Sequence, residues 1–369
     1  MPIYMDRHDV SDSETPENVA QLHQQDLKIQ DRFGCKGMTY WFDDKRKTAF
    51  CLIEAPNEGA LREMHNFAHG QVPHRVIEVD PIVVEAFLGR IGDPEKAENT
   101  PLNIIKDAAF RAIMVIDIRL LALKKDDLVR FSAGMQLFSV IMPPVLGEFG
   151  GSVVKQSNHH FLISFRGVSQ AVHAAFQLQK AFADCRSGIP RDRLLFTIGL
   201  STGVPVTEKN LIFEEAIRLA ERMAMCGKEE IVVSAEVREL YDSENPSALA
   251  RKKGVSCLTR ADEQFITRLM DHAEKCWSEI DLKVDDLNKP VGYSKPQLYR
   301  KMLLLTGKSP ITFIKEYRLN EALGLLNKEA GNVSQIAYEA GFSSPSYFAK
   351  CFQKRFGQSP TEYLAARVG

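Results

Sequence analysis

The chain has 369 residues, of which 44% are hydrophobic and 26% charged, and its formal net charge is −1. This length is too great for one ordinary hydrophobic core and predicts two or three domains. No apolar run approaches the roughly 20 residues that a membrane helix needs, and the first residues lack the pattern of a secretion signal. Seven cysteines without a Cys-x-x-Cys pair favour reduced thiols. We therefore expect a cytoplasmic protein with no membrane partner.

Polar stretches containing glycine and proline interrupt the chain twice, at 89–101 and at 242–254. Such stretches are typical of linkers between domains. They predict a multidomain α+β protein, and we place its three domains at residues 1–90, 105–245 and 262–369.

The first segment alternates strand and helix patterns in the order β-α-β-β-α-β, which is that of a ferredoxin-like fold. The expected strands are 2–8, 36–42, 48–55 and 74–80, and the expected helices are 16–33 and 57–70. In an antiparallel sheet of this order, one edge collects five potential metal ligands. They are His8, His23, Cys51, His65 and His69.

Two of these histidines, His65 and His69, are four residues apart on a helix, a spacing that lets two imidazoles bind one ion. His8 could supply a third ligand, and either His23 or the sulfur of Cys51 a fourth. Imidazole with one thiolate suits Zn, Ni or Cu better than Mg or Ca. The alternative is that these are ordinary surface or helix-end histidines.

Three stretches of this segment, YMDRH, FCLIEAPNEGALREMH and AHGQVPHRVIEVDP, resemble a small bacterial ferredoxin-like family that includes a nickel-binding protein. The resemblance covers nearly all of residues 1–90. It implies Ni or Zn as a cofactor of this segment, although the ligands of that family need not lie at these positions.

The middle segment has a buried-strand pattern at 109–121, whose one acidic residue is Asp117. The elements expected after it are a helix at 133–151, a hairpin at 152–165, a helix at 168–185, a strand pair within 194–206, a helix at 214–227 and a strand at 230–234. The order and the stretches GG and GLSTG resemble the catalytic domain of class III nucleotide cyclases. The resemblance implies a cyclase-like α/β domain that pairs head to tail with a second copy.

The cyclase family holds two metal ions with two carboxylates, and Asp117 matches the first of them. His159 stands where the second carboxylate belongs, so this ligand for Mg²⁺ is missing. Arg218 matches an arginine that steadies the transition state in that family, but Glu214 replaces the asparagine that accompanies it. We therefore expect no cyclisation by this domain. It either senses a nucleotide or serves only as a spacer and dimer clamp.

The last segment contains the same pattern twice, helix, glycine-containing turn and helix, at 284–307 and at 332–357. Between them, residues 309–329 predict a helix about 30 Å long. That length nearly matches the ~34 Å repeat of DNA, so the helix can hold two recognition helices in successive major grooves. Residues 262–369, and above all GKSPITFIKEYRLNEALGLL and IAYEAGFSSPSYFAKCFQKRFGQSP, resemble the AraC/XylS family of transcription regulators.

The resemblance implies a groove-reading face on the second helix of each repeat, with Leu298 and Met302 turned to the core. In the first repeat the expected DNA-binding residues are Ser294, Lys295, Pro296, Tyr299, Arg300 and Lys301. In the second they are Ser344, Pro345, Ser346, Ala349 and Lys350. Arg300 is the best candidate to read a guanine, and Lys295 and Lys301 are candidates for phosphate contacts. Pro290 departs from the family pattern and predicts a shortened helix before the first turn.

Taken together, these patterns predict a homodimeric regulator that binds double-stranded DNA and responds to a metal, a nucleotide or another small-molecule effector. Two alternatives stay open. One is a DNA-tethered enzyme that still makes a cyclic nucleotide, and the other is a metal-storage domain fused to a DNA-binding domain.

Overall fold

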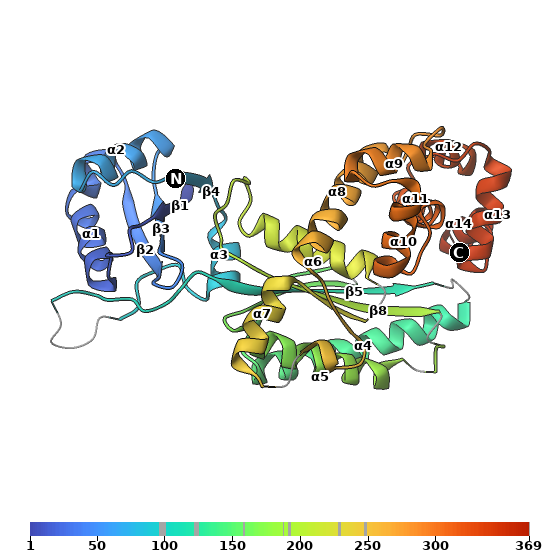
Figure 1. Ribbon diagram of the computed structural model, residues 1–369, viewed down its shortest axis with the longest axis horizontal. Helices are drawn as coiled ribbons and strands as arrows, with labels where there is room; N and C mark the ends of the chain where they lie inside the picture. The colour runs from blue at the N-terminus through green and yellow to red at the C-terminus, as the bar shows by residue number, and fades with distance from the viewer. Residues whose placement is uncertain are drawn as a thin grey trace.

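The structure is a computed structural model that describes residues 1–95, 101–121, 125–157, 159–186, 188–190, 193–227, 230–246 and 249–368. Figure 1 displays three units: a small N-terminal sheet with its helices, a larger central sheet, and a helical C-terminal unit that lies over the central sheet. This arrangement confirms the multidomain α+β layout expected from the sequence.

The N-terminal unit is a four-stranded antiparallel sheet in the order β2-β3-β1-β4, as in a ferredoxin-like fold. Its elements are β1 (Ile3–Asp9), α1 (Pro16–Ile29), η1 (Gln30–Phe33), β2 (Lys36–Asp43), β3 (Thr48–Glu54), α2 (Glu58–Ala68), β4 (Arg75–Glu78) and α3 (Pro81–Leu88). Both main helices begin at side-chain caps: Thr15 accepts from the amide of Asn18, and Asn57 from that of Ala60. The predicted β-α-β-β-α-β order is confirmed, and α3 was not predicted.

The middle unit is a six-stranded mixed sheet in the order β10-β9-β8-β5-β7-β6. Its elements are β5 (Arg111–Leu120), α4 (Lys125–Glu148), β6 (Gly151–Ser157), β7 (His160–Phe165), α5 (Val168–Cys185), β8 (Leu194–Gly203), α6 (Glu214–Cys226), β9 (Ile231–Val233), α7 (Ala235–Glu244), η2 (Leu249–Arg251) and β10 (Val255–Cys257). The sheet thus continues beyond residue 245, where the sequence suggested that the domain ends.

The expected strand pair within 194–206 is wrong. Leu194–Gly203 form one strand, β8, which pairs with β5 along its whole length. Glycines allow α6 to lie close to this strand: a Cβ placed on Gly199 would come within 2.0 Å of the carbonyl oxygen of Ala220. The pattern GLSTG lies within this one strand and marks a close contact between helix and strand.

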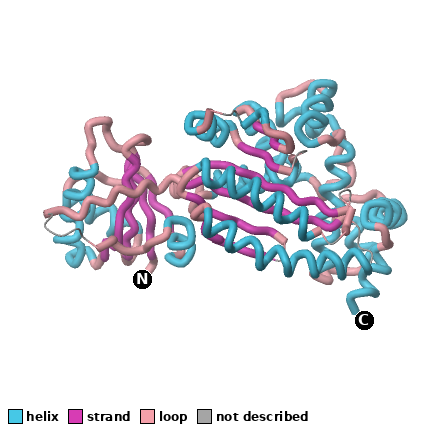
Figure 2. The backbone as a smooth tube through the Cα atoms, turned by 90° about the horizontal axis from the view of Figure 1, so that it is seen from below, coloured by secondary structure: helices cyan, strands magenta, loops and turns pink. Residues whose placement is uncertain are grey.

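Different elements cover the two faces of the central sheet. On the lower face in Figure 1 lie α4, α5 and α7, and Figure 2 shows that face toward the viewer. Their core includes Phe138, Phe161, Phe182 and Phe196. The other face is covered by α3 and α6, whose core is continuous with the N-terminal sheet through side chains that include Met5, Trp41, Phe50, Val115 and Phe213.

Helix α4 is long and apolar enough, by length and composition alone, to cross a membrane. The expectation that no stretch meets this test is therefore wrong. A single such helix is weak evidence for a membrane span, because one stripe of α4, with Phe131, Phe138, Met142 and Leu146, is buried against the sheet.

The C-terminal unit contains two helix-turn-helix repeats joined by one helix. Its elements are α8 (Arg260–Cys276), α9 (Val284–Val291), α10 (Lys295–Thr306), α11 (Pro310–Asn327), α12 (Val333–Glu339), α13 (Pro345–Phe356) and α14 (Pro360–Val368). The turns contain Gly292 and Gly341, whose φ angles of 73° and 74° favour glycine. Pro290 lies inside α9, which ends one residue later.

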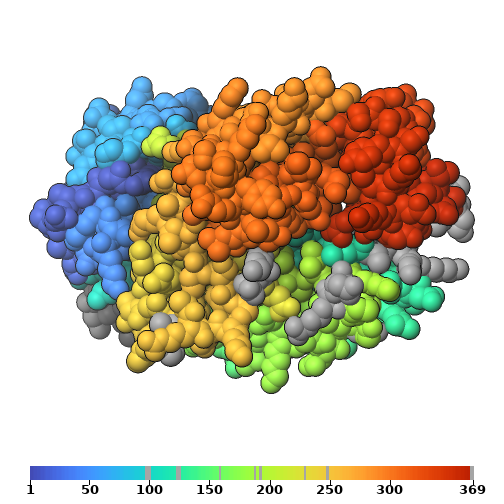
Figure 3. Space-filling model, turned by 45° about the vertical axis from the view of Figure 1, so that its right-hand side comes forward, coloured from blue at the N-terminus to red at the C-terminus, as the bar shows by residue number. Residues whose placement is uncertain are grey.

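The first repeat shares a hydrophobic core with the middle unit. Met223 and Cys226 of α6 and Val232 of β9 are buried together with Phe265 and Met270 of α8. Figure 3 shows the C-terminal residues lying directly on the middle unit. The second repeat has a separate core, which includes Phe348, Phe352 and Phe356. Contacts with α6 therefore position the first repeat, whereas the second repeat does not share this core.

A buried guanidinium accompanies this shared core. Arg222 of α6 is 5% exposed, and it pairs with Asp271 at 2.5 Å and with Glu274 at 3.3 Å, both on α8. Hydrogen bonds to charged groups contribute more to stability than neutral ones, and the two acids are accessible enough to hydrate if the arginine is removed.

We expect the substitution Arg222→Ala to lower the free energy of unfolding by about 1–3 kcal/mol. Urea unfolding measures this change. The control is Arg218→Ala on the same helix, whose side chain is 46% exposed and which should cost less than about 1 kcal/mol. Equal losses for the two variants would contradict the role given to Arg222.

Candidate metal centre and DNA-facing helices

The N-terminal unit encloses a small cavity between its sheet and its two main helices. Its volume is about 30 Å³, enough for one water molecule or one ion. All five potential ligands found in the sequence line it, namely His8, His23, Cys51, His65 and His69. The ferredoxin-like order does bring these residues together, although they are far apart in the chain.

Three of the residues that line the cavity also form a cluster with a fourth side chain: His8, Cys51 and His65 meet Asp6. One ligand atom from each lies within 4.8 Å of the others, and all four residues are buried. Asp6 is at the centre. Its Oδ1 accepts a hydrogen bond of 2.9 Å from the backbone amide of Cys51, and its Oδ2 lies 2.9 Å from Nε2 of His65.

A second group shares His65 with the first. Nδ1 of His65 and Nε2 of His69 each lie 3.2 Å from Oδ1 of Asp26, which comes from α1. The backbone amide of Gln71 donates to Nδ1 of His69, so the proton of a neutral His69 is on Nε2. His65 therefore stands between two carboxylates.

These contacts change the acidity of the groups. Burial opposes ionisation of Asp6, but His8 and His65 hold the pKa of its carboxyl well below the usual range. Burial also opposes the charge on His65, but Asp26 and Asp6 raise the pKa of this imidazole to about 10. Burial, together with Asp6 and Asp26, raises the pKa of the Cys51 thiol well above its usual value. The imidazolium of His65 thus stabilises the two carboxylates beside it, and the three groups together carry a net negative charge.

The donor set fits a transition metal. Nε2 of His8 and Oδ1 of Asp26 are buried and make no hydrogen bond, although each has an oppositely charged group within 3.4 Å. A buried polar atom without a partner costs about 1–3 kcal/mol, and an ion held by the first group of four residues would satisfy Nε2 of His8. Two imidazoles, one carboxylate and one sulfur are ligands of Zn and Ni rather than of Mg or Ca.

One expected ligand points elsewhere. His23 lines the cavity, but its Nε2 lies 3.3 Å from Asp93 and its ring packs against Tyr40. The sequence interpretation missed Asp6 and Asp26. Asp6 is two residues before His8 and so shares its face of the strand; Asp26 follows His23 by three on one face of a helix. These two spacings, of Asp6 to His8 and of Asp26 to His23, are the sequence signals that could have identified the two carboxylates.

On α10, the expected DNA-binding residues form an exposed face, while Leu298 and Met302 are fully buried as predicted. Ser294 caps the helix, and Pro296, Tyr299 and Arg300 are exposed. Two cations have partners within the chain: Lys295 pairs with Asp285 at 2.7 Å, and Lys301 pairs with Asp262 of α8. Arg300 is exposed, and its Nε donates to the backbone carbonyl oxygen of Pro296, one turn earlier on the same helix.

On α13 the corresponding face is less exposed. Ser346 and Lys350 are exposed, whereas Ser344, Pro345 and Ala349 are half-buried. Helix α11, which joins the repeats, has 18 residues and so is about 27 Å long.

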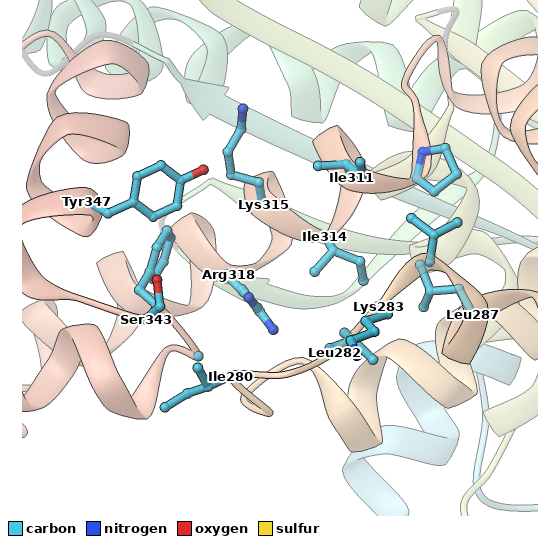
Figure 4. Close-up of a pocket in the computed structure, with 14 residues that line it drawn as sticks. Ile280, Leu282, Lys283, Leu287, Ile311, Ile314, Lys315, Arg318, Ser343 and Tyr347 are labelled. Carbon is cyan, nitrogen blue, oxygen red and sulfur yellow. The ribbon is translucent and has the colours of Figure 1, made fainter.

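A groove of about 450 Å³ lies between the two repeats. Figure 4 shows its apolar wall at Ile314 and Leu287, with Lys315, Arg318 and Tyr347 around it. Arg318 donates to the carbonyl oxygens of Trp277 and Glu279.

The positions that resemble a cyclase site do not form a metal site in the described residues. Asp117 pairs with Arg119 at 2.8 Å, and the ring of His159 packs against Phe131. Glu214 pairs with Arg218 on the same helix at 3.7 Å. Asn158, next to His159, lies outside the described residues. None of the seven cysteines, all of which lie among the described residues, forms a disulfide in the structure.

Two family models match parts of the chain. Residues 287–366 match a helix-turn-helix domain, and residues 4–79 match the family described as "Nickel responsive protein SCO4226-like". These two matches agree with the architecture that the sequence suggested, an AraC-type helix-turn-helix region at the C-terminal end and a segment similar to a nickel-responsive family at the N-terminal end.

Curated relatives match only a part of this chain. "Histidine kinase P4" of Formosa agariphila is 36% identical over 106 residues, which are 29% of this chain and 8% of that protein. "HTH-type transcriptional regulator MtrA" of Neisseria gonorrhoeae is 30% identical over 99 residues, or 27% of this chain and 31% of that protein. The chain therefore spans less than a third of the length of these relatives.

Two solved structures are similar to parts of the chain. SCO4226 from Streptomyces coelicolor is 28% identical, with 21% of this chain and 94% of that chain covered and a TM-score of 0.20. An adenylate/guanylate cyclase/hydrolase from Silicibacter pomeroyi is 24% identical, with 37% and 81% covered and a TM-score of 0.31.

Proposed function

We propose that this protein is a cytoplasmic, homodimeric transcription regulator that binds double-stranded DNA through α10 and α13 and responds to a transition metal in its N-terminal unit. The observation that carries the DNA-binding part is the pair of helix-turn-helix repeats on α11, within a segment that matches a helix-turn-helix family. Arg300 and the other exposed residues of α10 are the proposed reading face, and α13 contributes mainly backbone contacts.

The proposed metal is Ni²⁺ or Zn²⁺. Its support is the buried set of Asp6, His8, Cys51 and His65, in a segment that matches a nickel-responsive family. Asp26 and His69 would orient His65 from outside the ligand set, as outer partners of metal-bound histidines do. A bound metal can change DNA affinity only if the DNA-binding and non-binding arrangements hold it unequally.

We further propose that the middle unit makes no cyclic nucleotide. The support is the ring of His159, which packs against Phe131 where the cyclase family has a carboxylate, and Glu214, which would repel a polyphosphate.

For DNA binding, we expect Arg300→Ala to weaken binding to a selected DNA site by about 1–3 kcal/mol and to relax one base position, because a bidentate contact to guanine is lost. The site is selected from random-sequence DNA with the full chain, and binding is measured by gel shift and footprinting. Lys180→Ala on α5, an exposed cation far from both repeats, is the control. An unchanged footprint and affinity would refute the role of Arg300.

For the metal, we expect the purified chain to bind Ni²⁺ or Zn²⁺ in calorimetry, and the double variant His65→Ala/His69→Ala to lose this binding. His173→Ala, an exposed histidine on α5, is the control. DNA affinity is then measured with and without the metal, which distinguishes a metal-sensing regulator from a metal-storage domain. A store would bind the metal without any change in DNA affinity.

For the middle unit, we expect no cyclic AMP or cyclic GMP when the full chain is incubated with ATP or GTP and Mg²⁺ or Mn²⁺. Chromatography of the products measures this. Turnover above that of a heat-denatured sample would establish the alternative function, a DNA-tethered cyclase.

A further inference from the structure

The outward face of α4 is apolar and has no partner among the described residues. Val129 and Val140 are 65% and 70% exposed, and Leu137 is 47% exposed. The two prolines Pro143 and Pro144 continue the same exposed surface. Single exposed apolar residues are ordinary, but a contiguous row of them marks an interaction surface.

This face also has no charge. From Phe131 to Gly147 every residue of the helix is uncharged. The exposed positions 129, 133, 136, 140, 143 and 147 repeat at intervals of four and three residues, as in a helix that packs against another helix. Several of them are small, Ala133 and Gly147 among them, so another helix can come close.

Two opposite charges mark the ends of the face. Arg130 and Glu148 are both exposed, and neither has an ion-pair partner in the part of the chain that the structure describes. They are separated by 18 positions, or five turns, so they lie on the same side of the helix about 27 Å apart.

We propose that this face binds the α4 face of a second copy of the chain, with the two helices antiparallel. A two-fold axis perpendicular to the helices, near Ser139 and Val140, places Arg130 of each copy beside Glu148 of the other. The uncharged row between them then packs against itself, and the two helix dipoles run in opposite directions, which is favourable.

The other face of the central sheet is not available to a second copy. The opposite face of the central sheet is covered by the chain's own α3 and α6 and by the N-terminal sheet, with which it shares a core. The first helix-turn-helix repeat covers α6 in turn.

A lipid bilayer is the other occupant that an apolar helix suggests, and the structure favours it less. The opposite stripe of α4 is buried, with Phe138 and Met142 in the main core, so the helix cannot enter a bilayer without opening that core. Asp127 in its first turn is buried and pairs with Arg193 at 3.4 Å. The charged residues at the two ends of the helix include Asp126, Arg130 and Glu148, so they carry no positive excess that would favour an anionic membrane surface.

This inference rests on the proposed homodimer and names its surface. Sedimentation velocity of the full chain without metal or DNA, over a range of concentrations, tests it independently of DNA binding. We expect a monomer–dimer equilibrium in the wild type and a dimer Kd on the order of tenfold weaker or more for Val140→Glu, because an unpaired charge would be buried at the centre of the interface. Ile82→Glu, an exposed apolar position on α3, is the matched control and should leave the Kd unchanged.

Charge reversal tests the antiparallel register. Arg130→Glu alone should weaken the dimer, because it faces Glu148 of the other copy, and adding Glu148→Arg should restore it. A wild type that stays monomeric, or a double variant as weak as the single one, would overturn the proposal. So would a chain that cosediments with phosphatidylcholine/phosphatidylglycerol vesicles through the same face, lost on Val140→Glu. Circular dichroism confirms that each variant is folded.

Discussion

Helix α6 is the element on which the arrangement of all three units depends. Ala216 and Ala220 on one side belong to the core shared by the N-terminal and middle units. Met223 and Cys226 belong to the core shared with the first helix-turn-helix repeat. Gly199 in the strand below lets the helix lie against the sheet, since any side chain there would meet its backbone. Moving α6 would therefore disturb both cores at once, so its position couples the two ends of the chain.

A short connection leads from the candidate metal centre to α6. Arg7 lies on β1 between Asp6 and His8 and donates to the carbonyl oxygen of Val206, and Arg75 of the neighbouring strand donates to Asn210. The loop that holds these partners ends at Phe213, the residue before α6, in a left-handed conformation with φ of 55°. A non-glycine residue adopts this conformation only when its surroundings hold it there. A shift of β1 on metal binding would thus act on a constrained loop and then on α6.

The features that were predicted correctly from the sequence are those that depend on hydrophobic periodicity and on turn residues. The order of elements in the N-terminal unit, the two helix-turn-helix repeats and the burial of Leu298 and Met302 all follow from local spacing, and the structure confirms them. The same reasoning gathered five ligands at one edge because antiparallel topology alone determines which ends of strands and helices meet. It missed Asp6 and Asp26, since their spacings to His8 and His23 indicate only a shared strand or helix face and do not show that the carboxylates are buried beside histidines. It could not predict the docking on α6 either, because tertiary packing decides which apolar face meets which.

The candidate centre is better suited to regulation than to holding the fold together. A structural zinc site has nothing to replace its ion, so the domain unfolds without it. In this cluster the carboxylates of Asp6 and Asp26 flank His65, and Asp6 also accepts from the amide of Cys51. Those contacts hold β1, β3, α1 and α2 together without an ion. A metal would add a partner for Nε2 of His8, which makes no hydrogen bond without it, so its binding would change the contacts of β1 in a unit that is already held together.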